Sequence, residues 1–532
     1  MPIKVAVIGA GSIGFTRRLM KDILSVSELQ STHFAFHDIS KNNLEMITNL
    51  AKRDIAANKV PATITTSTNR RRALEGADYV LNLTRIGGLE AFKHDIDIPL
   101  KYGIDQCVGD TICAGGIMYG QRNIPQILAF AKDIRKDAKP NALFMNYANP
   151  MAMNTWAGLK YGGVNMVGLC HGVQGGHRQI TQVIELLVNK GKKQGDKGFK
   201  PVTKKDVNII CAGINHQTWY IKVQYKGKDW TGRLLEGFEQ HPTFSETEKV
   251  RIDMLRRFGY YSTESNGHLS EYVPWYRKRP REIRKWISLN TSWIHGETGG
   301  YLRVCTEGRN WFKTDYPNWL KAEPPKFTYE TRSEEHGSWI IEALETGRTY
   351  RGHFNVQNNG AITNLPNDAI VEVPGYIDKN GINIPQVGDL PLGCAAICSA
   401  SVNMQRMAVE AAVHGDVDLL KQAFMMDPLV GAVCNPPEIW QMVDEMLIAQ
   451  SEWLPQYKRQ LAKTKARFAS EKSLGTKKTL GAARLKTKSV AEMKKNAAQA
   501  RKNADAADKG NMTRTTQRPL NPRQMVNQLR KK

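Results

Sequence analysis

The sequence lacks the features that mark secreted proteins and membrane proteins. No run of apolar residues approaches the ~18 that a membrane-spanning helix requires. The eight cysteines have no paired spacing, and the opening MPIKVAVIGAGSIG has the pattern of a buried strand rather than of a signal peptide. These absences exclude a small scaffold held by disulfides. They predict a cytoplasmic protein that keeps its thiols reduced and makes no membrane contact.

Acidic residues are scarce in one part of the chain. The net charge is +24, and the segment from Lys458 to Lys532 holds 22 Lys and Arg against 4 Asp and Glu, which leaves only +6 for the remaining chain. After Phe468 this segment has almost no large apolar residues, so it cannot bury enough surface to offset the entropy of ordering. We predict that 456–532 is a disordered basic tail. Contact of this tail with nucleic acid is an open alternative that the sequence does not favour.

The rest of the chain is long enough for two packed units. At 532 residues the protein has roughly three times the length of a typical domain. Buried-strand patterns alternate with helical patterns in its first third, which predicts an α/β fold. We place a Rossmann-type dinucleotide-binding domain at 1–170 and an α+β catalytic domain at 171–455.

The first strand leads into a glycine-rich turn of the dinucleotide-binding type. In IKVAVIGAGSIGFTRRLMKDIL, an apolar strand is followed by Gly9, Gly11 and Gly14 and then by a helical pattern, with Ser12 inside the turn. The first glycine permits the tight turn, the second lets a pyrophosphate approach, and the third lets the helix pack on the strand. The next strand, HFAFHDIS, ends at Asp38, where an acid can bind the ribose hydroxyls of NAD. Since no Arg follows to accept the 2′-phosphate of NADP, NAD is favoured.

Later strands also end in polar residues. ADYVLNLTRIGG leads to Thr84, and ALFMNYANP ends in Asn149 and Pro150. Because ligands of an open parallel sheet gather beyond the carboxyl ends of its strands, we expect Thr84 to contact the cofactor and Asn149 to contact the cofactor or a sugar hydroxyl. The alternative for Asn149 is an Asn-Pro turn without a chemical role.

Cys170 and His216 form a candidate metal site. The strand GGVNMVGLC ends in Cys170, and the strand in VNIICAGINHQTW leads to His216, so both should reach the same edge of the sheet. One thiolate and one imidazole, with positions open for substrate oxygens, suit a borderline divalent cation, whereas structural zinc takes four protein ligands. The alternative is a buried cysteine that acts as a small apolar residue, beside a histidine that is satisfied in the core.

The chain resembles glycoside hydrolase family 4, the NAD- and metal-dependent glycosidases. The matching segments run in order from about residue 3 to about residue 450 and are GAGSIG, IPLKYGIDQCVGDTICAGGIMYGQRNIP, NYANPM, GLCHGV, INHQTWY, GYYSTESNGHLSEYVPWY and NNGAITNLPNDAIVEVP. The resemblance implies NAD and Mn²⁺ as cofactors, with Cys170 and His216 as metal ligands. It also implies a second half similar to that of lactate and malate dehydrogenases, and assembly as a homodimer or homotetramer.

The chemistry that the resemblance implies is a transient oxidation of the sugar. Hydride is removed from C3 by NAD, a base takes the C2 proton, and the glycosidic bond breaks by elimination before water adds and the hydride returns. His171 occupies the position where relatives carry an acid that assists the leaving oxygen. Alignment of SNGHLSEY puts His268 at the position of the base, with Tyr272 and Tyr261 close by, so the identity of the base stays open.

The triplet that begins with the thiol bears on the substrate. Cys-His-Gly resembles the α-galacturonidase branch, whereas Cys-His-Glu or Cys-His-Ser accompanies α-glucosidases and α-galactosidases, and the Cys-Asp-x-Pro motif of phospho-sugar members is missing. A uronate needs a cation for its C6 carboxylate, and Arg85 and Arg122 are the candidates. We therefore predict hydrolysis of α-galacturonides, such as pectin-derived oligosaccharides. An α-galactosidase or α-glucosidase, and a dehydrogenase of the lactate/malate type, stay open as alternatives.

Overall fold

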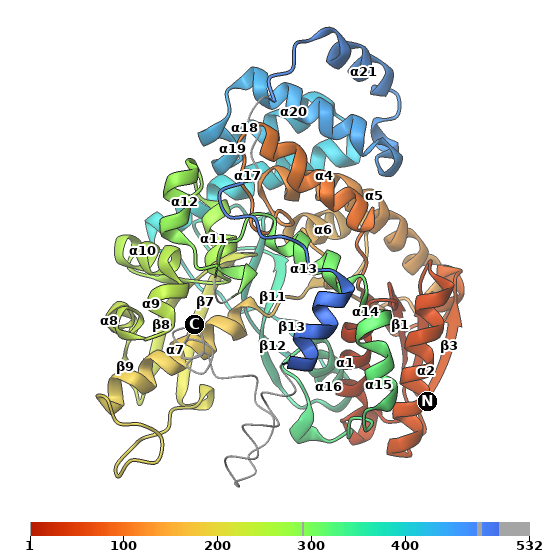
Figure 1. Ribbon diagram of the computed structural model, residues 1–532. Helices are drawn as coiled ribbons and strands as arrows, with labels where there is room; N and C mark the ends of the chain where they lie inside the picture. Colours follow the sequence, from red (N-terminus) through yellow and green to blue (C-terminus); the bar gives the residue numbers. More distant parts are fainter. Residues whose placement is uncertain (1, 290–291, 476–480, 500–532) are drawn as a thin grey trace.

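The computed structural model describes residues 2–289, 292–475 and 481–499. One mixed sheet runs through both halves of the chain (Figure 1). Its N-terminal part has six parallel strands in the order β3-β2-β1-β4-β5-β6, which confirms the predicted Rossmann-type fold. These strands are β1 (Lys4–Ile8), β2 (His33–His37), β3 (Thr63–Ser67), β4 (Tyr79–Asn82), β5 (Leu143–Asn146) and β6 (Met166–Gly168).

Antiparallel strands extend the same sheet beyond β6. There β11 pairs with β6 through Asn355 and Gly168, and β12 pairs with β11 and, through Glu372 and Gly213, with β7. The boundary predicted at 170 thus falls directly after β6, where the strand direction changes. The added strands are β7 (Val207–Ile214), β8 (Gln217–Tyr225), β9 (Lys228–Asp229), β10 (Tyr261–Ser262), β11 (Tyr350–Gln357), β12 (Ile370–Asp378) and β13 (Gly381–Asn383).

Helices cover both faces of the parallel part of the sheet. On one face α1, α2 and α16 bury an apolar core that includes Leu19, Ile47 and Ile341, and on the other α3 and α5 pack over Phe144. The helices of the first half are α1 (Ile13–Leu24), α2 (Lys41–Asn58), α3 (Arg70–Leu74), α4 (Gly88–Lys101), α5 (Cys113–Asp137), α6 (Met151–Ala157) and α7 (Gly172–Asn189). Because α16 comes from the second half, the two halves share a core as well as a sheet.

A second group of helices packs at the end of the molecule that is drawn at the top of Figure 1, where α17, α18 and α20 lie against α4 and α5. The remaining helices are α8 (Leu234–Gln240), α9 (Phe244–Thr247), α10 (Lys249–Phe258), α11 (Asn266–Tyr272), α12 (Pro280–Trp286), α13 (Gly300–Gly308), α14 (Trp311–Thr314), α15 (Tyr316–Lys321), α16 (His336–Thr346), α17 (Leu392–His414), α18 (Val417–Met426), α19 (Pro428–Val433), α20 (Pro436–Ala449) and α21 (Leu461–Ser470). Within the described ranges, no helix has the length and apolar character to cross a membrane.

The ordered chain continues past the boundary predicted at 456, which corrects the expected start of disorder. Helix α21 is held by Arg467, whose guanidinium forms two hydrogen bonds of 2.6 and 2.7 Å with Asp444. Further along, Ala482 and Ala483 are buried against Ile283 and Ile287. The prediction of disorder rested on the small number of large apolar residues. It missed this packing because Ala482 and Ala483 are small and because Arg467 is held by its charge. The rest of the predicted tail, 476–480 and 500–532, lies outside the described residues.

Removal of the segment 481–499 is expected to destabilise the protein. The backbone N–H of Ala482 donates to the buried Asp105 carboxylate at 2.8 Å, and Arg484 pairs with Asp97 at 2.7 Å. A chain ended at Gly475 loses these bonds and uncovers Ile283 and Ile287, which should lower the melting temperature by roughly 2–5 °C. A chain ended at Gln499 keeps these contacts and is the matched control, so it should melt above the chain ended at Gly475. Equal melting temperatures for all three would show that the segment contributes nothing.

Candidate active site

Cys170, His216 and Glu264 lie together at the carboxyl edge of the sheet. Cys170 follows β6, His216 sits in the turn between β7 and β8, and Glu264 follows β10. One ligand atom from each lies within 4.8 Å of the other two, and the Cys170 thiol donates to Glu264 Oε1 at 3.3 Å. The structure therefore brings the predicted pair together and adds a carboxylate that the sequence analysis missed.

The donor set of this cluster suits a borderline divalent cation. A thiolate, an imidazole and a carboxylate oxygen are a mixed soft and hard set of the kind that transition ions accept. Burial lowers the pKa of His216 to about 4, so the ring is neutral and can act as a ligand. Burial also raises the pKa of the Cys170 thiol, and Glu264 raises it further, so the thiolate needs a cation beside it.

Glu264 is an anion in this environment. Burial alone would raise the pKa of its carboxyl, but His216, His268 and His171 outweigh that effect and hold the pKa at about 2. The glycine of the Cys-His-Gly triplet has a part in this arrangement, since a Cβ on Gly172 would lie 1.9 Å from Glu264 Oε1. Gly172 therefore makes room for the carboxylate of the cluster.

Thr111 and Asp110 orient the ring of His216 through two linked hydrogen bonds. The Thr111 hydroxyl lies 2.9 Å from His216 Nδ1 and donates to Asp110 Oδ1, also at 2.9 Å. A hydroxyl that donates to the carboxylate accepts from the ring, so His216 carries its proton on Nδ1 and offers Nε2 to the cluster. The loop that carries this pair is anchored by Glu271, whose carboxylate accepts the backbone N–H groups of 107, 108 and 109.

Two of the three predicted substrate residues join the site through Asp110. Asn149 Nδ2 donates to Asp110 Oδ2 at 2.9 Å, and Arg85 Nη2 lies 3.6 Å from the same oxygen. The Arg85 guanidinium is surrounded by aromatic rings, with centroids at 4.3 Å for Phe92 and 4.7 Å for Tyr119. Its Nη1 has no hydrogen-bond partner among the described residues, so it can serve a bound ligand.

Arg122 does not face the site, which corrects its prediction as a substrate residue. Its side chain is 0% exposed and forms two hydrogen bonds, of 2.8 and 2.6 Å, with the fully buried Asp95. Two further guanidinium N–H groups donate to the Ile86 carbonyl and to Gln450. Four of the five guanidinium N–H donors of Arg122 are therefore used in holding α5 against α4, and the buried Asp95 already compensates its charge.

The predicted acid and base candidates differ in their positions. His171 is exposed, with Nδ1 3.8 Å from Glu335 Oε1. His268 lies on α11 with its ring 5.0 Å from that of His216, and its Nδ1 lies 2.9 Å from Ser265 Oγ. Tyr272, one turn further along, is buried 5.7 Å from the His268 ring, and burial raises its pKa well above the usual value. Both α11 residues thus border the cluster.

Tyr261 lies in the apolar core, which corrects its prediction as a catalytic residue. Its ring stacks on Phe238 at 3.9 Å and lies under the Arg251 guanidinium at 4.1 Å. The hydroxyl donates to Gln179 Oε1 at 3.0 Å. Strand β10 is only two residues long, and its pairing with β8 directs Tyr261 into the core, while Glu264 just beyond it reaches the cluster.

The glycine-rich turn has the geometry of a dinucleotide site. Gly9 has φ +86°, and a Cβ there would lie 3.0 Å from Thr84 Cγ2. The Gly11 N–H donates to Asp38 Oδ2 at 2.7 Å, and a Cβ on Gly11 would lie 2.5 Å from that oxygen. These contacts hold the turn close to the end of β2, where the predicted acid stands.

Three further cofactor candidates surround this turn. Ser12 is exposed at the start of α1, and Thr84 donates to Asn82 Oδ1 at 2.8 Å. Gly14 differs from expectation, because a Cβ there would meet nothing within 4 Å in the described structure. Close packing of helix on strand therefore does not explain this glycine.

A buried carboxyl next to the cluster was also missed by the sequence analysis. Glu372 on β12 accepts a hydrogen bond from Asn215 Nδ2 at 3.0 Å, and burial raises its pKa to about 8. It pairs in register with Gly213, three residues before His216. Glu372 is therefore a neutral acid in the wall of the site at neutral pH.

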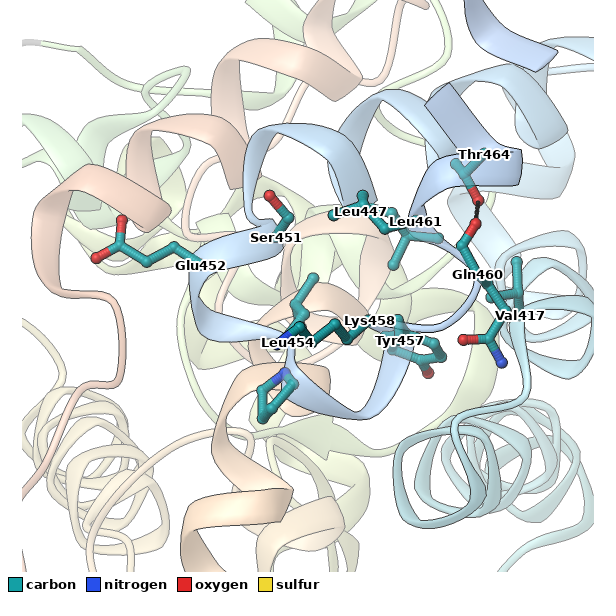
Figure 2. A pocket seen from close by; sticks show the side chains of 11 residues that line it. Val417, Leu447, Ser451, Glu452, Leu454, Tyr457, Lys458, Gln460, Leu461 and Thr464 are labelled. Atoms are coloured by element: carbon teal, nitrogen blue, oxygen red, sulfur yellow. Dashed lines mark hydrogen bonds between the residues drawn. The ribbon is translucent and has the colours of Figure 1, made fainter. Parts of the chain in front are cut away.

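The apolar cavity shown in Figure 2 is separate from this chemistry. It has a volume of about 440 Å³ and lies between α20 and α21, with Leu447, Leu454 and Leu461 in its wall. Within the described residues, its lining includes neither the cluster nor the glycine-rich turn. The candidate active site is thus the edge of the sheet, where the titratable groups converge.

Comparison with known proteins gives long matches. The model of the family 4 glycosyl hydrolases matches 4–186, and that of their C-terminal domain matches 211–430. An α-galactosidase of Rhizobium meliloti is 57% identical and covers 92% of this chain and 97% of its own length. An α-galactosidase of Bacillus subtilis is 33% identical, over 86% of this chain and 100% of its own length. An α-galacturonidase of Bacillus subtilis is 29% identical, over 84% of this chain and 97% of its own length.

Solved structures share the fold. A putative glucosidase from Bacillus subtilis superposes with a TM-score of 0.71 at 26% identity, covering 84% of this chain and 100% of that one. A 6-phospho-α-glucosidase from gut microorganisms, solved with NAD and Mn²⁺, has a TM-score of 0.66 at 19% identity and covers 86% of this chain and 100% of that one. At that level of identity the second likeness is one of fold.

Proposed function

Because the chain belongs to family 4 of the glycosyl hydrolases, it is a glycosidase, and we propose that it hydrolyses α-galactosides. The observation that carries this choice is the 57% identity to an α-galactosidase over 92% of the chain, against 29% to an α-galacturonidase. Two features of the site support it. Arg122 is committed to Asp95, and Gly172 accommodates Glu264, so neither favours a uronate. Hydrolysis of α-galacturonides, which the Cys-His-Gly triplet predicts, is the second candidate.

We also propose NAD and Mn²⁺ as cofactors. NAD would bind at the turn of Gly9 and Gly11 with its ribose on Asp38, and it supplies a reversible hydride acceptor for C3 of the sugar. Mn²⁺ would be held by Cys170, His216 and Glu264, where it supplies a Lewis acid for the sugar oxygens. The thiol, imidazole and carboxylate of the cluster fit such an ion.

The residues of the chain have the following roles in the proposal. Asn149 and Arg85, both fixed by Asp110, hold the sugar hydroxyls. His268 is the better placed base, because Ser265 holds its Nδ1 and leaves Nε2 for the C2 proton. Tyr272 stays protonated, since burial raises its pKa.

The leaving oxygen would be protonated at the outer side of the cluster. His171 is exposed beside Glu335, an arrangement that suits a proton donor.

A panel of p-nitrophenyl glycosides tests the substrate. With NAD, Mn²⁺ and a reductant present, we expect kcat/KM for the α-galactoside to exceed that for the α-galacturonide and the α-glucoside by at least about tenfold. The reason is that Arg122 is already paired with Asp95 and Arg85 already lies beside Asp110, so the carboxylate of a uronate would find little uncompensated positive charge and would be costly to desolvate. A preference for the α-galacturonide would instead favour the second candidate. Hydrolysis of the preferred substrate in D₂O should place deuterium at C2, whereas net accumulation of NADH from a hydroxy acid would indicate a dehydrogenase.

Substitution of Thr111 should weaken metal binding. In Thr111→Val the ring of His216 loses its hydrogen bond, so its tautomer and orientation are no longer fixed, and Mn²⁺ affinity should fall by about 10- to 100-fold. Thr111→Ser keeps the hydroxyl and should bind the ion like the natural protein. Mn²⁺ titration followed by electron paramagnetic resonance measures both. Equal affinity for Thr111→Val would show that Thr111 does not position the ligand.

A further inference from the structure

A second cavity lies between α7, β7, β11 and α16, and the proposed reaction does not use it. Its volume is about 390 Å³. Three imidazoles, of His177, His336 and His353, line it together with the cations Lys204, Lys205 and Arg351. The residues of the Cys170 cluster are not among the described lining residues, so this is a separate site.

His353, which lines this cavity, carries a buried nitrogen for which the described chain provides no partner. The residue is 8% exposed, and its Nε2 makes no hydrogen bond among the described residues. Burial, together with the charges of His336, Arg351 and His177, lowers the pKa of His353 to about 3, so the ring is neutral and can donate from Nε2. Buried nitrogens of this kind are normally paired, by protein or by a bound group.

Positive charge exceeds negative charge around this nitrogen. Lys204 and Arg178 share the single carboxylate of Glu334. Arg351 donates to the backbone carbonyl of Ile209 at 2.9 Å rather than to an acid. Burial, and to a smaller extent the charge of Arg178, lowers the pKa of Lys204 to about 8.

We propose that this cavity binds a small oxyanion of the phosphate class. Such an ion accepts hydrogen bonds on every face, so it can take the His353 Nε2–H together with the ammonium of Lys204 and the guanidinium of Arg351. The volume admits inorganic phosphate with waters or the phosphate group of a small ester. A neutral sugar would leave the excess positive charge uncompensated.

The bound oxyanion lies one side chain away from the Cys170 backbone. His336 reaches the Cys170 carbonyl oxygen with Nε2 at 3.0 Å and the Tyr350 hydroxyl with Nδ1 at 2.7 Å. An ion among the neighbours of His336 therefore bears on the position of the thiol. The effect of the ion on the position of the Cys170 thiol rests on the proposed function. The binding of the oxyanion does not, because it requires no metal or sugar.

Isothermal titration calorimetry of the full-length protein, without added metal, tests the site. Inorganic phosphate should bind saturably with one ion per chain. His353→Phe removes only an unpaired nitrogen and should fold normally, while it weakens phosphate binding at least about tenfold. Lys204→Met should weaken binding to a similar extent. Lys197→Met, on the same surface loop but outside the cavity, is the matched control and should bind like the natural protein.

Further arms identify the ion and its place. If glycerol 3-phosphate binds more tightly than inorganic phosphate, the ligand is a phosphate ester. If inorganic phosphate binds more tightly, the ligand is the free ion. Both results support the proposal. Cys170→Ser should leave phosphate binding unchanged. No saturable binding up to ~20 mM, equal binding by His353→Phe and Lys204→Met, or loss of binding only in Cys170→Ser would each overturn the proposal. None of these results decides whether the protein cleaves α-galactosides, which the glycoside panel measures separately.

Discussion

Replacement of Cys170 by serine is expected to abolish both metal binding and glycoside hydrolysis. A serine hydroxyl is a poor ligand at neutral pH, and Cys170 contributes the soft member of the donor set. Since loss of even an outer hydrogen bond to a ligand costs 10- to 100-fold in affinity, Mn²⁺ affinity should fall by at least about 100-fold. The activity with saturating NAD should fall by a similar factor or more. Mn²⁺ titration by electron paramagnetic resonance and steady-state kinetics measure the two effects.

Cys434→Ser is the matched control for this experiment. Cys434 is also buried, but its thiol donates to the Tyr102 carbonyl oxygen, which a serine can also do. This variant should keep its metal affinity. Glu264→Gln keeps the size of the third ligand and removes its charge, so it should also weaken Mn²⁺ binding. Full activity of Cys170→Ser would refute the assignment of the thiol as a ligand.

Replacement of Arg122 by methionine is expected to destabilise the fold without changing substrate recognition. Arg122 and Asp95 are both 0% exposed, and removal of one partner leaves a buried charge without compensation. Such a change costs about 3–5 kcal/mol in the free energy of unfolding. Urea denaturation measures the loss, and KM measured on the folded fraction for each glycoside should stay unchanged.

The double variant Arg122→Met/Asp95→Leu separates the two possible roles of Arg122. It removes both charges and fills the space with apolar atoms, so it should recover most of the stability that the single variant loses. Arg70→Met, which breaks a partly exposed pair with Asp133, is a milder control and should cost at most about 1 kcal/mol. A stable Arg122→Met with a KM raised only for α-galacturonides would restore Arg122 as a substrate residue.

The parts of the site that could be predicted are those that regular structure places. Parallel strands end at the same edge of a sheet, so the end of β6 located Cys170, and the apolar strand β7 located the turn that carries His216. The glycine-rich turn could be recognised because strand, glycines, helix and acid follow one another within a short stretch. The sequence alone was sufficient to predict a site residue wherever a strand end or a turn motif fixes the position of that residue.

The parts that were missed depend on tertiary contacts. Glu264 follows a strand of only two residues, which leaves no periodic pattern to indicate its direction. Asp110 and Thr111 lie in a loop that is fixed by the distant Glu271. Arg122 was predicted to bind the substrate because a guanidinium pairs well with a carboxylate. The sequence does not show that Arg122 already forms an ion pair with Asp95.

The single sheet also limits how the enzyme can move. Strand β6, which ends two residues before Cys170, is hydrogen-bonded on one side to the dinucleotide half and on the other to β11. A hinge between the halves would have to break these backbone bonds, so the distance between the glycine-rich turn and the Cys170 cluster is set by the sheet itself. In the proposed reaction, sugar would therefore enter and product would leave through rearrangement of surface loops, while this spacing stays constant.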